Sequence, residues 1–137
     1  MSKKLTHRLT PGEDEMIRKD VNEIEKRTFY GFNDYTIYAL VNLDNGKRYI
    51  GRTEDPRSRI KAHFYGIKTH KHPNKLINKD SDCEFGYEIL ETGLSVTDGD
   101  KEKTYMMFYQ TYDDDFGYNG NDPVFRYSKP QVNAGEQ

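Results

Sequence analysis

A glycine-containing turn between two short runs of β-forming residues constrains the fold of this chain more than any other feature. Residues 35–42 have the sequence YTIYALVN, residues 47–52 have the sequence KRYIGR, and Asn45-Gly46 lies between them. Asn-Gly is the strongest short signal for a two-residue hairpin turn, because such a turn requires positive φ at both positions. The sequence therefore predicts an antiparallel hairpin.

The hairpin sets the direction of two tyrosine side chains. With a two-residue turn, Tyr49 pairs with Asn42, which lies four residues from Tyr38 and therefore shares its face of the sheet. Tyr38 and Tyr49 are thus predicted to project from the same side.

The segment after the hairpin has the signals of a helix start. Thr53 or Asp55 can cap the helix, and Pro56 suits its first turn. Arg59 and His63 are four residues apart, so they are neighbours on one helical face.

Turn signals and hydrophobic periodicity place the other elements. Residues 10–13 form a capping box, and apolar residues recur at helical spacing after it. The sequence predicts one small α+β domain with strands over 35–42, 47–52 and 83–91, and helices over about 10–27, 56–65, 73–79 and 100–112.

Composition indicates a soluble protein. The chain has 137 residues, of which 34% are hydrophobic and 32% are charged, with eleven Tyr and seven Phe available for a core. No apolar run approaches the length of a membrane span, and the first residues lack the apolar segment of a secretory signal. Cys83 is the single cysteine, which excludes cysteine-rich zinc sites. We expect a cytoplasmic protein that does not bind membranes.

The small net charge of −2 conceals a basic block in the middle of the chain. Residues 46–79 contain ten Lys or Arg and two Asp or Glu, whereas residues 80–137 contain four and thirteen. A solvated surface is the simplest interpretation of such a block, and a footprint for nucleic-acid phosphates is the functional one. The candidate phosphate contacts are Arg52, Arg57, Lys61, Lys68, His70, Lys71, His72 and Lys75.

The hairpin and the helix after it contribute side chains that suit chemistry at a phosphodiester. Arg59 can stabilise developing negative charge, and Tyr38, Tyr49 or His63 can accept or position a proton. A phenol ordinarily has a pKa of about 10, so it becomes a useful base only beside a cation such as Arg59 or Arg52. Two half-buried structural tyrosines are the alternative.

In type and order, these residues resemble the motifs of the GIY-YIG endonucleases. The resemblance covers residues 35–120, and the ordered series is more specific than either tripeptide alone. Its elements are Thr36-Ile37-Tyr38, Tyr49-Ile50-Gly51, Arg59, His63, Glu102 and Gly117-Tyr118-Asn119.

The resemblance implies a three-stranded antiparallel sheet flanked by helices, in agreement with the elements predicted above. It makes residues 35–120 the nuclease domain, residues 1–34 an N-terminal helical extension and residues 121–137 a polar tail. The extension is loosely similar to that of the compact phage endonuclease II branch, where such regions help to assemble oligomers. A homodimer or homotetramer is the corresponding expectation.

The resemblance also implies a role for each site residue in hydrolysis of double-stranded DNA. Glu102 would bind one Mg²⁺, with Mn²⁺ as a substitute, and Arg59 would hold the scissile phosphate. Tyr38 would contact or activate the attacking water, Tyr49 would position it, and His63 would relay a proton or donate to phosphate. Cleavage would leave a 5′ phosphate.

Two further residues receive supporting roles from the resemblance. Arg52 occupies a position where many members carry Lys, and it would lower a tyrosine pKa. Asn119 would bind near the DNA and tie the last segment of the domain to the active site by hydrogen bonds.

The chain departs from the family pattern at Thr36, which replaces the Gly of the first tripeptide. This departure keeps open a second interpretation, a catalytically inactive module that only binds nucleic acid. A third is a protein-binding factor whose acidic last third mimics DNA. Glu88 and Glu91 are alternatives to Glu102 as the metal ligand, and His70 and His72 are too few to predict a zinc site.

Overall fold

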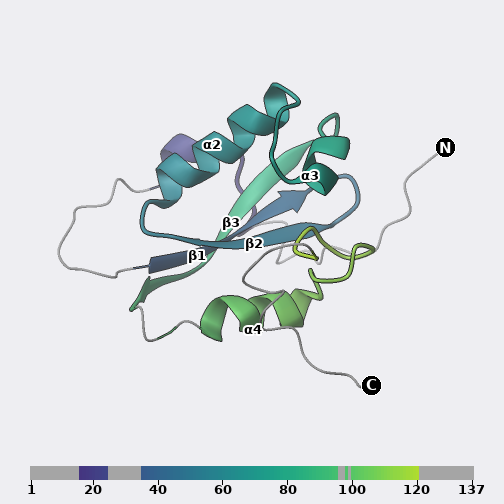
Figure 1. The fold of residues 1–137 in the computed structure, drawn as a ribbon. Coiled ribbons are helices and arrows are strands. Elements are labelled where there is room, and N and C mark those ends of the chain that lie inside the picture. The colour runs from purple at the N-terminus through teal and green to yellow at the C-terminus, as the bar shows by residue number, and fades with distance from the viewer. Residues whose placement is uncertain (1–15, 25–34, 96–97, 99, 121–137) are drawn as a thin grey trace, which may run out of the picture.

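The computed structural model describes residues 16–24, 35–95, 98 and 100–120 (Figure 1). Its three-stranded antiparallel sheet has the order β2-β1-β3 and is flanked by helices, which confirms the predicted α+β class. Helices α2 and α3 lie above the sheet in Figure 1, and α4 lies below it. The bounds are η1 (Val21–Glu23), β1 (Tyr35–Asn42), β2 (Arg48–Thr53), α2 (Pro56–Lys68), α3 (Lys75–Lys79), β3 (Phe85–Leu94) and α4 (Asp100–Tyr109).

The hairpin between β1 and β2 has a longer connection than the sequence predicted. Leu40 pairs with Tyr49, and the backbone N–H of Asn42 donates to the carbonyl of Lys47 at 2.8 Å. The predicted pairing of Asn42 with Tyr49 is therefore wrong by two residues, and residues 43–46 form the connection. The register moves by an even number, so Tyr38 and Tyr49 share a face as predicted.

The side chain of Asn42 explains the longer connection. Its Oδ1 accepts hydrogen bonds from the backbone N–H groups of Asp44 at 2.8 Å and Asn45 at 3.3 Å. These bonds bend the backbone directly after Asn42. Gly46 then takes a φ of 82°, a conformation that glycine adopts without steric cost.

Strand β1 separates two hydrophobic cores because its side chains alternate between the faces of the sheet. Tyr38 and Leu40 pack toward α2, in a core that includes Ile60. Ile37 and Ala39 belong to the opposite core, which α4 completes through buried Met106.

The helices that flank the sheet begin at side-chain caps. Asp55 caps α2 by accepting the N–H of Ser58 at 3.1 Å, and Pro56 occupies the first turn, as predicted. Asn74 caps α3 by accepting the N–H of Leu76 at 3.0 Å. Helix α2 continues three residues beyond the predicted end near residue 65.

The predicted helix over residues 10–27 is wrong for residues 17–24, although Met16 is helical; its start at Thr10 lies outside the described residues. Arg18 forms an antiparallel bridge with Tyr87 of β3, and a short 3-10 helix, η1, follows. Ile17 packs on the α4 side of the sheet, whereas Val21 and Ile24 pack on the α2 side. Residues that cover opposite faces of a sheet cannot form one helical stripe, although their spacing imitates it.

Candidate active site

A chain of hydrogen bonds links a strand tyrosine to two histidines on the α2 side of the sheet. Tyr38 Oη lies 2.8 Å from His63 Nε2, and His63 Nδ1 lies 2.7 Å from His72 Nε2. His72 Nδ1 accepts the backbone N–H of Asn74 at 3.0 Å. Residues from β1, α2 and the loop before α3 therefore meet in one polar array.

The Asn74 amide fixes the direction of this array when both imidazoles are neutral. A backbone N–H can only donate, so His72 Nδ1 is an acceptor and its proton is on Nε2. That proton is donated to His63 Nδ1, which leaves the His63 proton on Nε2. His63 consequently donates to Tyr38 Oη.

Both histidines are held in the neutral form. Burial, the neighbouring His72 and the cation of Arg59 lower the pKa of His63 from 6.5 to about 3. Burial also lowers the pKa of His72. His63 is therefore a hydrogen-bond donor near pH 7 and not a cation that attracts phosphate.

Tyr49 completes the aromatic wall of this site. Its ring centroid lies 6.5 Å from that of Tyr38 and 5.4 Å from that of His63. Gly51 pairs with Tyr38 across the hairpin, and a Cβ at Gly51 would overlap the Tyr38 hydroxyl and the ring carbons beside it. The glycine of the second tripeptide thus provides the space for the Tyr38 side chain.

Arg59 lies one helical turn before His63, as predicted, and it is exposed. Its charge reaches the imidazole, because it is among the causes that lower the pKa of His63. The structure thus brings Tyr38, Tyr49, Arg59 and His63 to one face of the sheet. An exposed guanidinium beside a buried polar array is well placed to meet an incoming phosphate.

Arg52 does not join this group. Its guanidinium lies 4.7 Å from the centroid of the Tyr35 ring, and Arg52 pairs with Ile37, whose side chain belongs to the α4 core. Adjacent strand residues project to opposite faces, so Arg52 points away from the face of Tyr38 and Tyr49. The prediction that Arg52 lowers the pKa of one of these tyrosines is therefore wrong.

Glu102 lies in α4, on the opposite side of the sheet from the helix that carries Arg59 and His63 (Figure 1). It lies in the first turn of α4, is 5% exposed, and belongs to a helix that packs against β2, the strand that carries Tyr49. Glu88 and Glu91, the two alternatives to Glu102 as metal ligand, are engaged with other side chains of the protein.

Glu88 forms a buried ion pair with Arg48 at 3.6 Å.

Glu91, the other alternative, is bound by α4. Its carboxylate accepts the Tyr105 hydroxyl at 2.9 Å and lies 3.6 Å from the Lys101 ammonium. A bulge in the pairing of β1 with β3 precedes it, so Glu91 pairs with Ile37, which faces the α4 core.

The basic block divides into surface and structural residues. Arg57 donates to the backbone carbonyls of Asn22, at 3.2 Å, and Ile24, so it anchors the N-terminal segment. His72 is 7% exposed, whereas a loop histidine that contacts phosphate must be accessible to the DNA. The candidates that remain exposed are Lys61, Lys68, His70, Lys71 and Lys75.

Asn119 is completely buried, so the prediction that it contacts DNA is wrong. Its Oδ1 accepts the N–H of Ile50 at 2.8 Å, and its Nδ2 donates to the carbonyl of Ile50 at 3.0 Å. The predicted tie between the last segment and the β2 tripeptide is present. The sequence suggested His72 only as a phosphate contact, and its hydrogen bond with His63 was not predicted, because that contact depends on how the loop after α2 folds back.

The described residues contain no group of three or more His, Cys, Asp or Glu side chains that could hold a metal ion. A Mg²⁺ site does not need such a group, because Mg²⁺ is commonly bound by one or two carboxylates together with water and substrate phosphates. The hard carboxylate oxygens of Glu102 fit that requirement.

Comparisons with known proteins identify the family and the fold of the chain. The sequence model of the GIY-YIG catalytic domain matches residues 34–116. Among solved structures, the chain is similar to the catalytic domain of a mutant of the intron endonuclease I-TevI. The two are 23% identical with a TM-score of 0.56, and the match covers 65% of this chain and 95% of that domain. This likeness shows the fold.

A search of curated proteins found no match. In the part of the chain that the structure describes, no helix is both long and apolar enough to cross a membrane. The family match spans more than half of the 137 residues. The chain therefore belongs to the GIY-YIG endonuclease superfamily, and its catalytic domain is that of a nuclease, which hydrolyses phosphodiester bonds.

Proposed function

We propose that this protein is a Mg²⁺-dependent endonuclease that cuts double-stranded DNA. The observation that carries the proposal is the hydrogen bond between Tyr38 Oη and His63 Nε2, at 2.8 Å, beside the exposed cation of Arg59. This places a group that can bind or deprotonate water next to a group that can hold a phosphate.

The residues of the α2 face act on the attacking water. Tyr38 acts as a phenolate once its own proton has been released, and the hydrogen bond donated by His63 stabilises this negative charge on Oη. The phenolate orients the attacking water and takes up the proton that the water loses. Tyr49 limits the space beside Tyr38, so that the water approaches the phosphorus from one side. Arg59 binds the scissile phosphate and stabilises the additional charge of the transition state.

Glu102 would hold the metal ion, with Mg²⁺ as the natural ion and Mn²⁺ as a substitute. When bound by Glu102, the ion would supply positive charge to stabilise the phosphate and the leaving 3′ oxygen. Glu102 lies in the first turn of α4, within the segment from residue 35 to residue 120 that we propose as the catalytic domain.

One site of this kind makes one cut. The protein would therefore nick DNA as a monomer, or make double-strand breaks as a homodimer or homotetramer that pairs two sites. The exposed lysines of α2 and the following loop would contact the DNA backbone, which makes binding weaker as salt concentration rises.

Cleavage of supercoiled plasmid with and without a chelator tests the proposal. We expect wild-type protein to nick in Mg²⁺ and to stop in chelator, and Glu102→Gln to be inactive in either. Asp100→Asn, an exposed acid in the same helical turn, is the matched control and should cut like wild type. Wild-type protein that binds DNA but never cuts it would instead support the inactive binding module.

A further inference from the structure

His72 has a position that the proposed chemistry does not explain. It is 7% exposed, lies in the loop between α2 and α3, and meets the site at the imidazole of His63. A buried polar ring of this kind needs partners for both nitrogens, and it has them in His63 and in the amide of Asn74.

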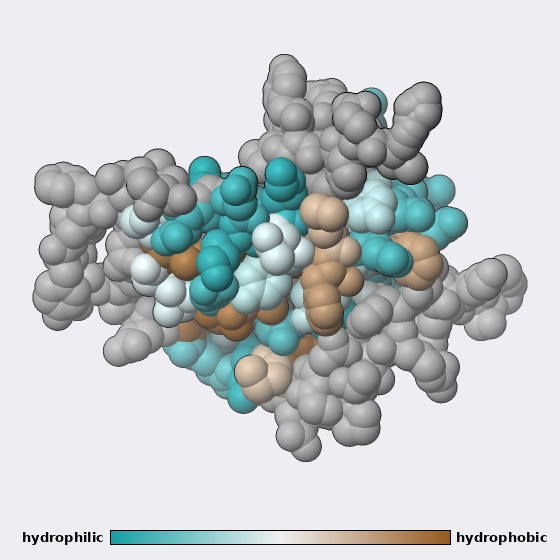
Figure 2. All heavy atoms as spheres, turned by 90° about the horizontal axis from the view of Figure 1, so that it is seen from below, coloured by the Kyte–Doolittle hydropathy of each residue, from teal (hydrophilic) through white to brown (hydrophobic). Residues whose placement is uncertain are grey.

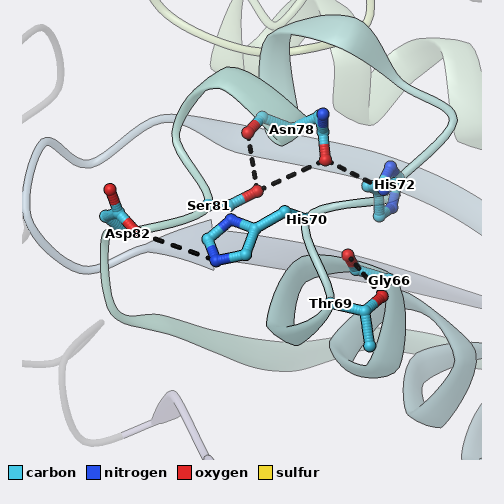
Figure 3. A network of polar contacts seen from close by, with 7 residues as sticks. All are labelled: Gly66, Thr69, His70, His72, Asn78, Ser81 and Asp82. Carbon is cyan, nitrogen blue, oxygen red and sulfur yellow. Dashed lines mark hydrogen bonds and ion pairs between the residues drawn. The ribbon is translucent and has the colours of Figure 1, made fainter.

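Hydrogen bonds around the loop hold the backbone of His72 in place (Figure 3). The backbone N–H of His72 donates to Asn78 Oδ1 at 3.0 Å, and the hydroxyl of Ser81 donates to the carbonyl of Asn78 at 2.6 Å. The same residue is therefore fixed at its backbone by Asn78 and at its ring by Asn74.

Helix α2 fits closely against the other side of His72. A Cβ at Gly66 would lie 3.3 Å from both Cα and Cδ2 of His72, which is tighter than ordinary packing. The absence of a side chain at Gly66 thus lets the loop approach the helix that carries His63.

We infer that His72 is a positioning residue that fixes the tautomer of His63, so that His63 Nε2–H donates to Tyr38 Oη. The inference rests on the proposed function of Tyr38 at the attacking water. The backbone N–H of Asn74 can act only as a donor, so it fixes His72 Nδ1 as an acceptor. His72 Nε2–H must then donate to His63, and His63 Nε2–H must donate to Tyr38 Oη.

The alternative tautomer would reverse the last hydrogen bond. With its proton on Nδ1, His63 would accept the Tyr38 hydroxyl proton at Nε2, and that proton would point into the protein. In the tautomer fixed by His72, a donor stabilises the negative charge that remains on Oη once the phenol has released its proton. Only this direction suits a phenolate oxygen that orients water and then takes up its proton.

Nitrogen-15 NMR of the histidine side chains tests the inference without reference to activity. Each ring nitrogen shows by its chemical shift whether it carries a proton. We expect His63 and His72 in the wild-type protein to be protonated at Nε2 and unprotonated at Nδ1. A proton on Nδ1 of either ring in wild-type protein would overturn the inference, and this measurement requires no variant to fold.

Variants of His72 test the catalytic consequence. In His72→Leu, which removes the donor, we expect a mixture of His63 tautomers and a kcat at least about tenfold lower, with KM changed by less than about twofold. His72→Gln keeps a side-chain N–H donor and should recover most of kcat. Asp82→Asn, at an exposed position between α3 and β3, is the control and should match wild type.

The outcomes separate this inference from the proposed function. A wild-type protein that cuts DNA, together with a His72→Leu variant that is folded and equally active, would refute the positioning role alone. A wild-type protein with the expected tautomers that does not cut DNA would refute the proposed function, and the hydrogen-bond array would remain as the NMR shows it.

Discussion

The carboxamide of Asn119 satisfies both backbone polar groups of Ile50, with distances of 2.8 Å to the nitrogen and 3.0 Å to the oxygen. Because Asn119 is completely buried, Asn119→Ala would leave a donor and an acceptor without partners and should lower the free energy of unfolding by about 2–4 kcal/mol. Urea denaturation measures the loss, and amide hydrogen exchange should accelerate at Ile50. Unchanged exchange at Ile50 would contradict the structural role.

Gly51 is predicted to be essential because the Tyr38 side chain occupies the space beside it. Gly51→Ala should displace the tyrosine, cost about 1–3 kcal/mol of stability and abolish plasmid nicking. Gly93→Ala is the comparison: it has a φ of 75° and no atoms nearby, so it should cost about 1–2 kcal/mol with normal nicking. Equal loss of activity in both variants would point to general instability.

Arg59→Ala should reduce the single-turnover cleavage rate by at least about a hundredfold, since the transition-state charge loses its cation. The fold should survive because Arg59 is exposed. Removal of the cation should also raise the pKa of His63, which NMR titration can detect. Ser58→Ala, at the adjacent exposed position, should leave both quantities unchanged.

The free energy of unfolding should fall as the pH decreases from about 7 to 5. Unfolded histidine binds a proton below its ordinary pKa of 6.5, whereas folded His63 does so only near pH 3, so protons favour the unfolded chain in this range. Each such histidine contributes at most about 1.4 kcal/mol per pH unit. The slope should be smaller in His63→Gln, and an unchanged slope would show that other groups cause it.

The buried ion pair of Arg48 and Glu88 should be structural. Arg48 is 1% exposed, and its guanidinium also lies 4.4 Å from the centroid of the Tyr109 ring. Glu88→Ala would leave a buried cation without this partner and should cost about 3–5 kcal/mol. Replacement of both residues by Met should recover most of the loss, and Mg²⁺ dependence should be unaffected in the double variant.

Local signals in the sequence were sufficient for most elements of the fold. The cap at Asp55 and the β-forming residues of β1 place a helix and a strand, because these features act over a few residues. The register of the hairpin was not predictable from Asn45-Gly46, since the side chain of Asn42 competes for the same backbone groups. The helix predicted before β1 was wrong because the apolar residues of that segment pack into two different cores.

The site was predictable where one element carries two of its members. Arg59 and His63 follow from helical spacing, and the shared face of Tyr38 and Tyr49 follows from strand parity. The direction of Arg52 follows from the same parity and was overlooked. The role of His72 depends on contacts made across a folded loop, which no local pattern encodes.

The α4 side of the molecule shows apolar residues at the surface among hydrophilic ones (Figure 2). Phe108 and Met107 of α4 are 74% and 44% exposed. These two apolar side chains are not part of the core, so the periodicity of apolar residues in the helix does not predict where they lie.

The two outer strands of the sheet are each occupied partway along their length. On β3, Tyr87 forms a bridge with Arg18. On β2, Arg48 forms a bridge with Gly117, and the side chain of Asn119 is hydrogen-bonded to the backbone N–H and carbonyl of Ile50. A second copy cannot extend this sheet as an added strand without displacing these segments. We therefore expect any assembly of this nuclease to form through side chains, which leaves the sheet protected against edge-to-edge aggregation.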